Sequence, residues 1–428
     1  MSTTSVTTIS REARRARFAV GVLFFTNGAL FANVVPRYPE LKSDLGLSNA
    51  AIGTAVAAFP LGALICGLAA GLLIRRFRSS RVAVAATLVT ALGLVLAGVA
   101  PSWLLLAAAF FIAGAMDSIT DVAQNSHGLR VQRLFGRSII NSFHAVWSIG
   151  AVAGGIMGAG AAALRIPLPV HLTVSAVLFG LAALLAYRWL LPGAEPRDIE
   201  GIEGIEGLDG TAGADGADHS DAAAARPTAS ARASKLAGSR YVILLALVLI
   251  ASGGAIVEDA GASWSAIYLS EGLGASAFVA GLGFISLQGM QFVGRLLGDR
   301  MVDRFGQRAV ARVGGALVLV GMGSALALPG VPMTIIGFGV AGFGVATLIP
   351  SAMQAADELP GFAPGAGLTI IGWLLRVGFL LSPPIVGAIA DATSLRTGLL
   401  VVPAAGLIVL VFAGVLSARR VHRDGRDG

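Results

Sequence analysis

The sequence Gly-Ala-Met-Asp-Ser-Ile-Thr-Asp-Val-Ala-Gln-Asn-Ser-His, residues 114–127, decides the fold of this chain. It ends a segment that opens with an apolar run, residues 103–115, long enough to be buried in lipid. Asp117, Asp121 and Gln124 are three and four residues apart, so they share one face of a helix. A carboxylate near the centre of a bilayer costs about 2.5–3.5 kcal/mol on insertion scales. Two of them on one face therefore predict a helix bundle with a polar interior, and we expect this face to line a solute pathway.

The composition is that of a membrane protein. Of the 428 residues, 55% are hydrophobic and 13% are charged, whereas soluble proteins have about 25% charged residues. Apolar runs of about 20 residues follow one another, each ended by charged residues, Pro or Gly, and predict a polytopic helical membrane protein. The single cysteine, Cys66, excludes an intrachain disulfide and a cysteine-based metal site.

The positions of the basic residues predict the topology. Most of the 31 Lys and Arg residues lie in the N-terminal tail, alternate loops, the central linker and the C-terminal tail. By the positive-inside rule, both termini are therefore expected in the cytoplasm. We attribute the basic balance to topology and expect no nucleic-acid partner.

Twelve spans are predicted, in two groups of six. They cover residues 18–37, 49–74, 82–99, 103–127, 140–163, 170–191, 241–270, 275–300, 309–328, 333–356, 364–390 and 395–417. Residues 192–239 between the groups are rich in Gly, Ala, Asp and Glu, and are predicted to be a disordered cytoplasmic linker. The expected domains are a tail (1–16), a six-helix bundle (17–191), the linker, a second six-helix bundle (240–418) and a tail (419–428).

A weak internal repeat supports this division. Residues 66–77 read Cys-Gly-Leu-Ala-Ala-Gly-Leu-Leu-Ile-Arg-Arg-Phe, and residues 294–305 read Gly-Arg-Leu-Leu-Gly-Asp-Arg-Met-Val-Asp-Arg-Phe. Each is a Gly-rich helix that runs into a basic loop at the same place in its half. Parallel repeats about an axis normal to the membrane are typical of one class of transporters.

At these residues the chain resembles the major facilitator superfamily. The loop 303–308, Asp-Arg-Phe-Gly-Gln-Arg, is similar to the cytoplasmic signature Gly-x-x-x-Asp-Arg-x-Gly-Arg-Arg, although in the first half Arg75 replaces the acid and Arg78 the glycine. Stretches 121–125, 144–150, 258–264 and 382–387 resemble a bacterial group near the sugar and fucose permeases. The resemblance implies an all-α membrane fold of two pseudo-symmetric six-helix bundles, with gating by Asp303, Arg304 and Arg308. Motifs of drug–proton antiporters are poorly matched.

Ionisable residues within the spans are the candidates for proton coupling: Asp117, Asp121, Glu258 and Asp259. Glu258 and Asp259 point about 100° apart on a helix, so we expect only one of them, preferably Glu258, to face the cavity. The alternatives are structural hydrogen bonds from Asp117 or Asp121 to Asn141 or His144, and a packed ion pair for Glu258 or Asp259.

Other polar and aromatic residues within the spans are candidates for solute binding. They are Asn27, Asn125, Asn141, His144, Trp147, Trp264, Gln288 and Arg376. The resemblance implies that spans one, four and seven line the cavity. Arg376 either pairs with Glu258 or Asp259, or binds an anionic group of the solute through its planar guanidinium. Trp264 either stacks on a sugar ring or packs in the bundle.

The predicted function is secondary active transport of a small polar solute, such as a sugar or an organic acid, by alternating access and driven by protons. The absence of a Gly-x-x-x-x-Gly-Lys-Ser/Thr loop argues against direct use of ATP. Export of a drug or metabolite and a non-transporting membrane sensor are the alternatives. We expect a monomer in the inner (plasma) membrane, with no cofactor or metal and no enzymatic activity, because no nucleophile–base pair or metal cluster is visible.

Overall fold

A computed structural model describes residues 9–193, 228–360, 362 and 366–417. Within these residues the regular structure is entirely helical, and twelve helical segments are long and apolar enough to cross a membrane. The predicted spans are confirmed in number. Most of the predicted linker, residues 194–227, lies outside the described residues, whereas its last part belongs to helix α9, which begins at Thr228.

The N-terminal half contains six membrane-crossing segments and one short helix. They are α1 (Arg11–Val34), α2 (Tyr38–Asp44), α3 (Asn49–Cys66) with α4 (Ala70–Phe77), α5 (Ser79–Gly98), α6 (Trp103–Phe135), α7 (Ile140–Ala163) and α8 (Leu168–Tyr187). Serine hydroxyls accept backbone N–H groups at three helix starts, Ser10 for α1, Ser48 for α3 and Ser102 for α6. Helix α6 packs between α3 and α5, and α1 packs along α7.

The C-terminal half repeats this plan. Its helices are α9 (Thr228–Ile267), α10 (Ala277–Phe305), α11 (Gln307–Ala327), α12 (Val331–Val345) with α13 (Leu348–Asp357), α14 (Ala366–Ala392), and α15 (Leu395–Gly398) with α16 (Val401–Phe412). Helix α12 packs between α10 and α11 as α6 does between α3 and α5. The turns that follow α4 and α10 also match, because Arg78 has φ 74° and ψ 144° and Gly306 has φ 83° and ψ 154°.

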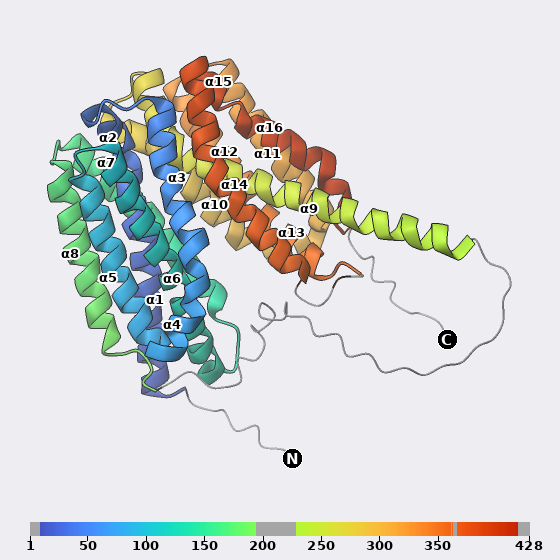
Figure 1. The fold of residues 1–428 in the computed structure, drawn as a ribbon, viewed down its shortest axis with the longest axis horizontal. Helices are drawn as coiled ribbons and strands as arrows, with labels where there is room; N and C mark the ends of the chain where they lie inside the picture. Colours follow the sequence, from blue (N-terminus) through green and yellow to red (C-terminus); the bar gives the residue numbers. More distant parts are fainter. Residues whose placement is uncertain (1–8, 194–227, 361, 363–365, 418–428) are drawn as a thin grey trace, which may run out of the picture.

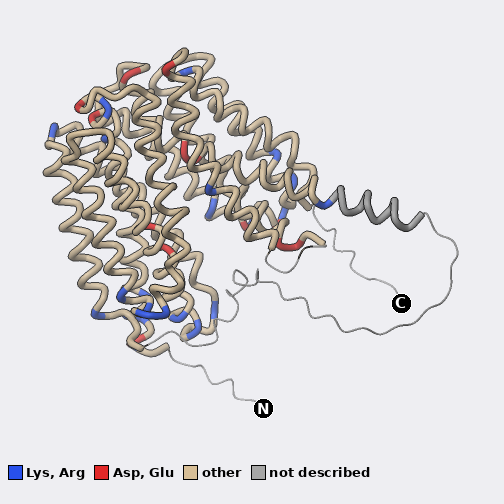
Figure 2. The backbone as a smooth tube through the Cα atoms, in the orientation of Figure 1, with Lys and Arg blue, Asp and Glu red and all other residues tan. Residues whose placement is uncertain are grey.

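The two halves meet mainly through two helix pairs, α3 with α14 and α7 with α10, and the α2 region also touches α9. In Figure 1 the bundles lie together near α2 and α15 and diverge toward the other end. We call the first end the closed end. Figure 2 shows that Lys and Arg residues gather at the opposite end of the N-terminal half, which we call the basic end. Helices α3–α4 and α14 are the two least buried of the membrane-crossing segments, as expected if they touch only near the closed end.

Three contacts between the halves hold the closed end. Asp391 at the end of α14 accepts the backbone N–H groups of Asn49 (2.9 Å) and Ala50 (2.8 Å) at the start of α3. Lys42 of α2 forms an ion pair with Glu271, just after α9. The backbones of α3 and α14 also come close, because a Cβ added at Gly53 would lie 2.5 Å from the carbonyl oxygen of Pro383.

Candidate functional site

In the N-terminal half, three helices bring polar side chains together at Asn27 of α1. The Asn27 amide nitrogen donates to Asp117 Oδ1 of α6 (2.6 Å), and Trp147 Nε1 of α7 donates to Asn27 Oδ1 (2.8 Å). Asn27 is 5% exposed, and Asp117 and Trp147 are half-buried. This chain of hydrogen bonds orients the amide so that its N–H groups face the acid. Asp117 therefore bonds to Asn27, and not to Asn141 or His144 as the structural alternative proposed.

Asp121 lies one turn along the same face of α6 and is exposed. It accepts hydrogen bonds from Gln124 (3.4 Å) and Asn125 (3.0 Å) of its own helix. The charges of His144 on α7 and Arg376 on α14 also act on its carboxyl group. Because Arg376 belongs to the other half, Asp121 faces the space between the bundles.

Glu258 of α9 interacts with α10 within the C-terminal half. Its Oε1 accepts from the Gln291 amide and lies 3.5 Å from Arg295 Nη2. The charge of Arg295 in turn acts on His144 of the N-terminal half. Glu258 is thus paired with Arg295, whose positive charge repels a protonated His144 of the opposite bundle.

Asp259, the next residue, points elsewhere. Ser263 donates to Asp259 Oδ1 (3.3 Å), and Asp259 Oδ2 is buried with no hydrogen-bond partner among the described residues. The Asp259 charge acts on Tyr38 of α2, which places Asp259 where the halves meet. Trp264 is 1% exposed and packs beside Gly53 of α3, so its indole is covered by the N-terminal half in this conformation.

Arg376 is exposed and lies far along α14 from the closed end. In the described part of the chain it makes no hydrogen bond or ion pair, and Asp121 is the acid on which its charge acts. The internal pairing with Glu258 or Asp259 that the sequence left open is therefore not formed. Its guanidinium is free for a ligand.

The remaining predicted residues are less closely connected to this cluster. Asn141 and Gln288 make no side-chain hydrogen bond to the described residues, and Asn141 is exposed whereas Gln288 is half-buried. In the predicted gating loop, Asp303 and Arg304 are exposed, and Arg308 donates to the Leu416 carbonyl at 3.0 Å within its own half. No described residue of the N-terminal half forms an ion pair with this loop.

Sequence reasoning missed Gln291, Asp391 and Tyr38. Gln291 is 2% exposed and lies one helical turn after Gln288, so a polar residue on the same face of α10 was the available signal. Asp391 and Tyr38 had no such signal, because their partners are far away in the chain.

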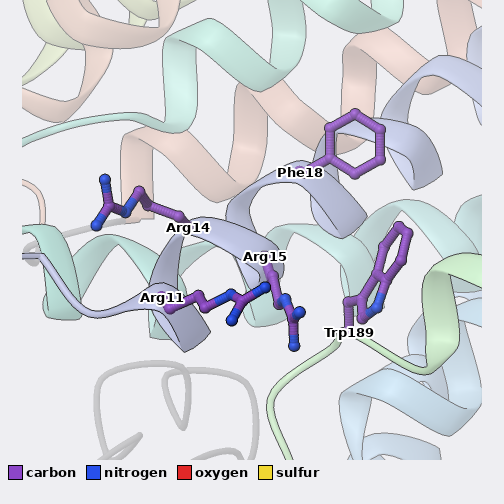
Figure 3. Close-up of a pocket in the computed structure, with 5 residues that line it drawn as sticks. All are labelled: Arg11, Arg14, Arg15, Phe18 and Trp189. Atoms are coloured by element: carbon purple, nitrogen blue, oxygen red, sulfur yellow. The ribbon is translucent and has the colours of Figure 1, made fainter.

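A separate surface pocket lies at the basic end. It is lined by Arg11, Arg14, Arg15, Phe18 and Trp189 (Figure 3). The two aromatic rings are 5.9 Å apart, and all five residues are exposed. The pocket lies on α1 and just after α8, away from the mid-span residues, so we do not include it in the candidate site.

The known families and sequences that match this chain are membrane proteins, and most of them are named as transporters. A sequence model described as Major Facilitator Superfamily matches residues 20–300 and 259–428. The uncharacterized transporter y4wD of Sinorhizobium fredii is 27% identical over 400 residues, which are 92% of this chain and 96% of that protein. The membrane protein MosC of Rhizobium meliloti is 28% identical, over 95% of this chain and 91% of its own.

Solved structures share the fold at low sequence identity. A mutant form of the nucleoside transporter NupG superposes with a TM-score of 0.71 at 14% identity, over 94% of this chain and all of its own (100%). A bacterial homologue of the lysosomal transporter Spinster, solved inward-facing and unoccupied, gives 0.68 at 13% identity, over 95% and 98%. A D-xylose–proton symporter gives 0.65 at 16% identity, over 94% and 95%. None of these matches tests the predicted nearness to the sugar and fucose permeases.

Proposed function

The chain belongs to the Major Facilitator Superfamily of membrane transporters, and we propose that it moves a small polar solute by alternating access, coupled to protons. The observation that carries this proposal is the attraction between Asp121 of the N-terminal half and Arg376 of the C-terminal half, together with the charge of Arg295 acting on His144 across the same space. These residues belong to bundles whose packing contacts lie near the closed end. A solute that enters between the bundles would meet these side chains.

The positive-inside rule supports placing the basic end in the cytoplasm. With that orientation, the conformation is inward-facing, as the Spinster homologue is described to be. Asp391, Lys42 and Glu271 then close the external side. Transport in either direction requires these contacts to break while the two bundles come together at the end opposite the closed end.

For proton coupling we propose Asp117, Asp121 and Glu258. Each carboxyl is held by hydrogen-bond donors from the protein: Asn27 for Asp117, Gln124 and Asn125 for Asp121, and Gln291 for Glu258. Alternating access would expose these acids to one side of the membrane and then to the other, so each can take up a proton on one side and release it on the other. Protonation of Asp121 would also free Arg376 from its attraction to the opposite half.

The proposed solute class is supported by polar side chains that are accessible in this conformation. Arg376 offers a planar fork of donors, which suits a carboxylate. Asn141 and His144 are exposed on α7 and Asn125 is half-buried on α6, and their side chains offer hydrogen-bonding groups suited to hydroxyls. We therefore propose an organic acid or a sugar as the solute.

The test is solute-dependent proton movement in proteoliposomes that contain the purified protein and an internal pH dye. A panel of sugars and organic acids is added outside, and in parallel is loaded inside to test export. We expect Asp117→Asn, Asp121→Asn and Glu258→Gln to lower the solute-dependent proton flux at least tenfold, because an amide cannot release a proton.

The matched control is Asp299→Asn, which removes an exposed carboxylate of α10 that lies near the basic end. It should transport as the unmodified protein does. Undiminished proton flux in the three site variants would refute the assignment of these carboxyls. Tight binding of a solute without any flux would instead favour the sensor.

A further inference from the structure

We propose that Asp259, Ser263 and Ser382 form a binding site for a sodium ion, separate from the proton-binding acids. The site would make the transporter depend on a second cation. This proposal goes beyond proton coupling, and it rests on the geometry of α9 and α14 alone. It does not require the solute to be known.

Packing between α9 and α14 brings Ser382 to Asp259. A Cβ added at Gly378 of α14 would lie 3.6 Å from Ser252 Cβ and 3.7 Å from Ala255 Cβ of α9. The two helices run in the same direction, because α9 and α14 both end at the closed end, so one more turn along each brings Ser382 beside Asp259. Ser263, one turn after Asp259, already donates to its Oδ1. The two hydroxyls therefore flank one carboxyl group.

Two oxygen atoms of this cluster lack a partner. Ser382 is 4% exposed, and its Oγ has no hydrogen bond among the described residues; the same is true of Asp259 Oδ2. The Ser382 hydroxyl is near enough to act on the Asp259 carboxyl, but the pair does not complete a hydrogen bond of good geometry. Because buried polar atoms are normally paired, these two oxygens indicate a missing ligand between them.

The charge of Asp259 also lacks compensation. Glu258, its neighbour, has Arg295 at 3.5 Å, but no Lys, Arg or His among the described residues forms an ion pair with Asp259. A buried carboxylate within a membrane span is retained where a cation or a partner neutralises it. A bound cation would supply the missing charge and use the free oxygens.

The donor atoms suit a hard cation. The carboxylate and both serine hydroxyls offer oxygen, the atom preferred by hard cations. Pro383 lies inside α14 and has no N–H, so the Phe379 carbonyl four residues earlier loses its helical partner. Freed carbonyls of interrupted membrane helices coordinate sodium in other transporter architectures. This carbonyl, on the same helix as Ser382, would be the nearest candidate in the sequence for a further oxygen ligand.

The residues that cover the site indicate the side of the membrane from which sodium would reach it. Gly53 of α3 lies against Pro383 and Trp264. Tyr38 of α2 is 1% exposed, and the charge of Asp259 acts on it. Both covering residues belong to the N-terminal half near the closed end. Separation of the halves there would uncover Asp259, so sodium would enter from the closed end and would be occluded in the conformation described here.

The test is binding of radioactive sodium (²²Na⁺) to the purified full-length protein in detergent, at constant pH and ionic strength with choline as the replacement cation. We expect saturable binding to the unmodified protein that is lost in Asp259→Asn and weakened at least tenfold in Ser382→Ala. Ser324→Ala is the matched control, because that hydroxyl bonds to carbonyls of its own helix. It should bind sodium as the unmodified protein does.

A second measurement guards against misfolded variants. Sodium, but not choline, should raise the thermal unfolding temperature of the unmodified protein, because a ligand that binds the folded state stabilises it. Asp259→Asn should unfold cooperatively yet show no such rise. The proposal is overturned if the unmodified protein binds no sodium above this variant, or if the variant keeps full binding. Neither measurement depends on a solute or on transport. Both can therefore be interpreted even if the protein does not couple transport to protons.

Discussion

Arg78 has a backbone conformation that L-residues rarely adopt. Its φ of 74° and ψ of 144° match those of Gly306, the residue at the same place in the second half. Only glycine occupies this region of φ and ψ without a steric penalty. The sequence already showed that Arg78 replaces the glycine of the superfamily signature, and the structure shows that the turn kept the glycine geometry.

Arg78→Gly is therefore expected to stabilise the protein. Removal of the side chain should relieve about 1–3 kcal/mol of strain, less the added flexibility of glycine in the unfolded chain. The measurement is the thermal unfolding temperature in detergent, which should rise. Arg76→Gly is the control, because Arg76 lies in the last turn of α4 and glycine there should lower stability. An unchanged or lower unfolding temperature for Arg78→Gly would contradict the strain.

At the scale of elements, the contact between α3 and α14 decides which side is closed. The first N–H groups of a helix have no partner within it, and they carry partial positive charge. Asp391 of α14, in the other half of the molecule, accepts hydrogen bonds from the first N–H groups of α3, those of Asn49 and Ala50. Because the capping side chain and the helix belong to different bundles, the cap forms only while the closed end stays closed.

Asp391→Asn should shift the molecule toward opening at the closed end. Loss of the charge at the helix start is expected to cost about 1 kcal/mol, or roughly fivefold in the ratio of closed to open molecules. Spin labels at Ser43 and Ser276, exposed residues of the two halves at this end, would report the change as longer distances in a Cys66→Ser background. Asp299→Asn serves as the control and should keep the original distances. Identical distributions in both variants would rule out a role for this cap.

At the scale of the whole molecule, we propose that the two bundles form one polar site between them. The N-terminal half supplies Asp121 and His144, and the C-terminal half supplies Arg376 and Arg295. Neither half holds the complete set. Motion of one bundle against the other therefore changes the site and its access together, as alternating access requires.

The orientation of the molecule gives a direct prediction. Single cysteines at Ser276 of the closed end and Ser138 of the basic end, in the Cys66→Ser background, are offered a membrane-impermeant maleimide in intact cells. Ser276→Cys should react at once, and Ser138→Cys only after the membrane is permeabilised. The reverse pattern would place the basic end outside, and the conformation described here would then be outward-facing.

The sequence by itself determined the membrane class, the number of spans and the two halves, and it supplied most of the ionisable residues of the proposed site. These depend on local quantities: the length of an apolar run, the sign of a loop's charge, and the cost of a carboxylate in lipid. Asp117 and Asp121 were found in this way, because a charge in a span is improbable without a polar environment.

Only the tertiary structure decided the partners of these residues. Asn27 meets Asp117 and Trp147, the charge of Arg376 acts on Asp121, and Asp391 caps a helix of the other half. Such pairs join residues about 90 to 340 positions apart. They depend on the rotation of each helix about its axis and on which end of the molecule is closed, and helix packing sets both.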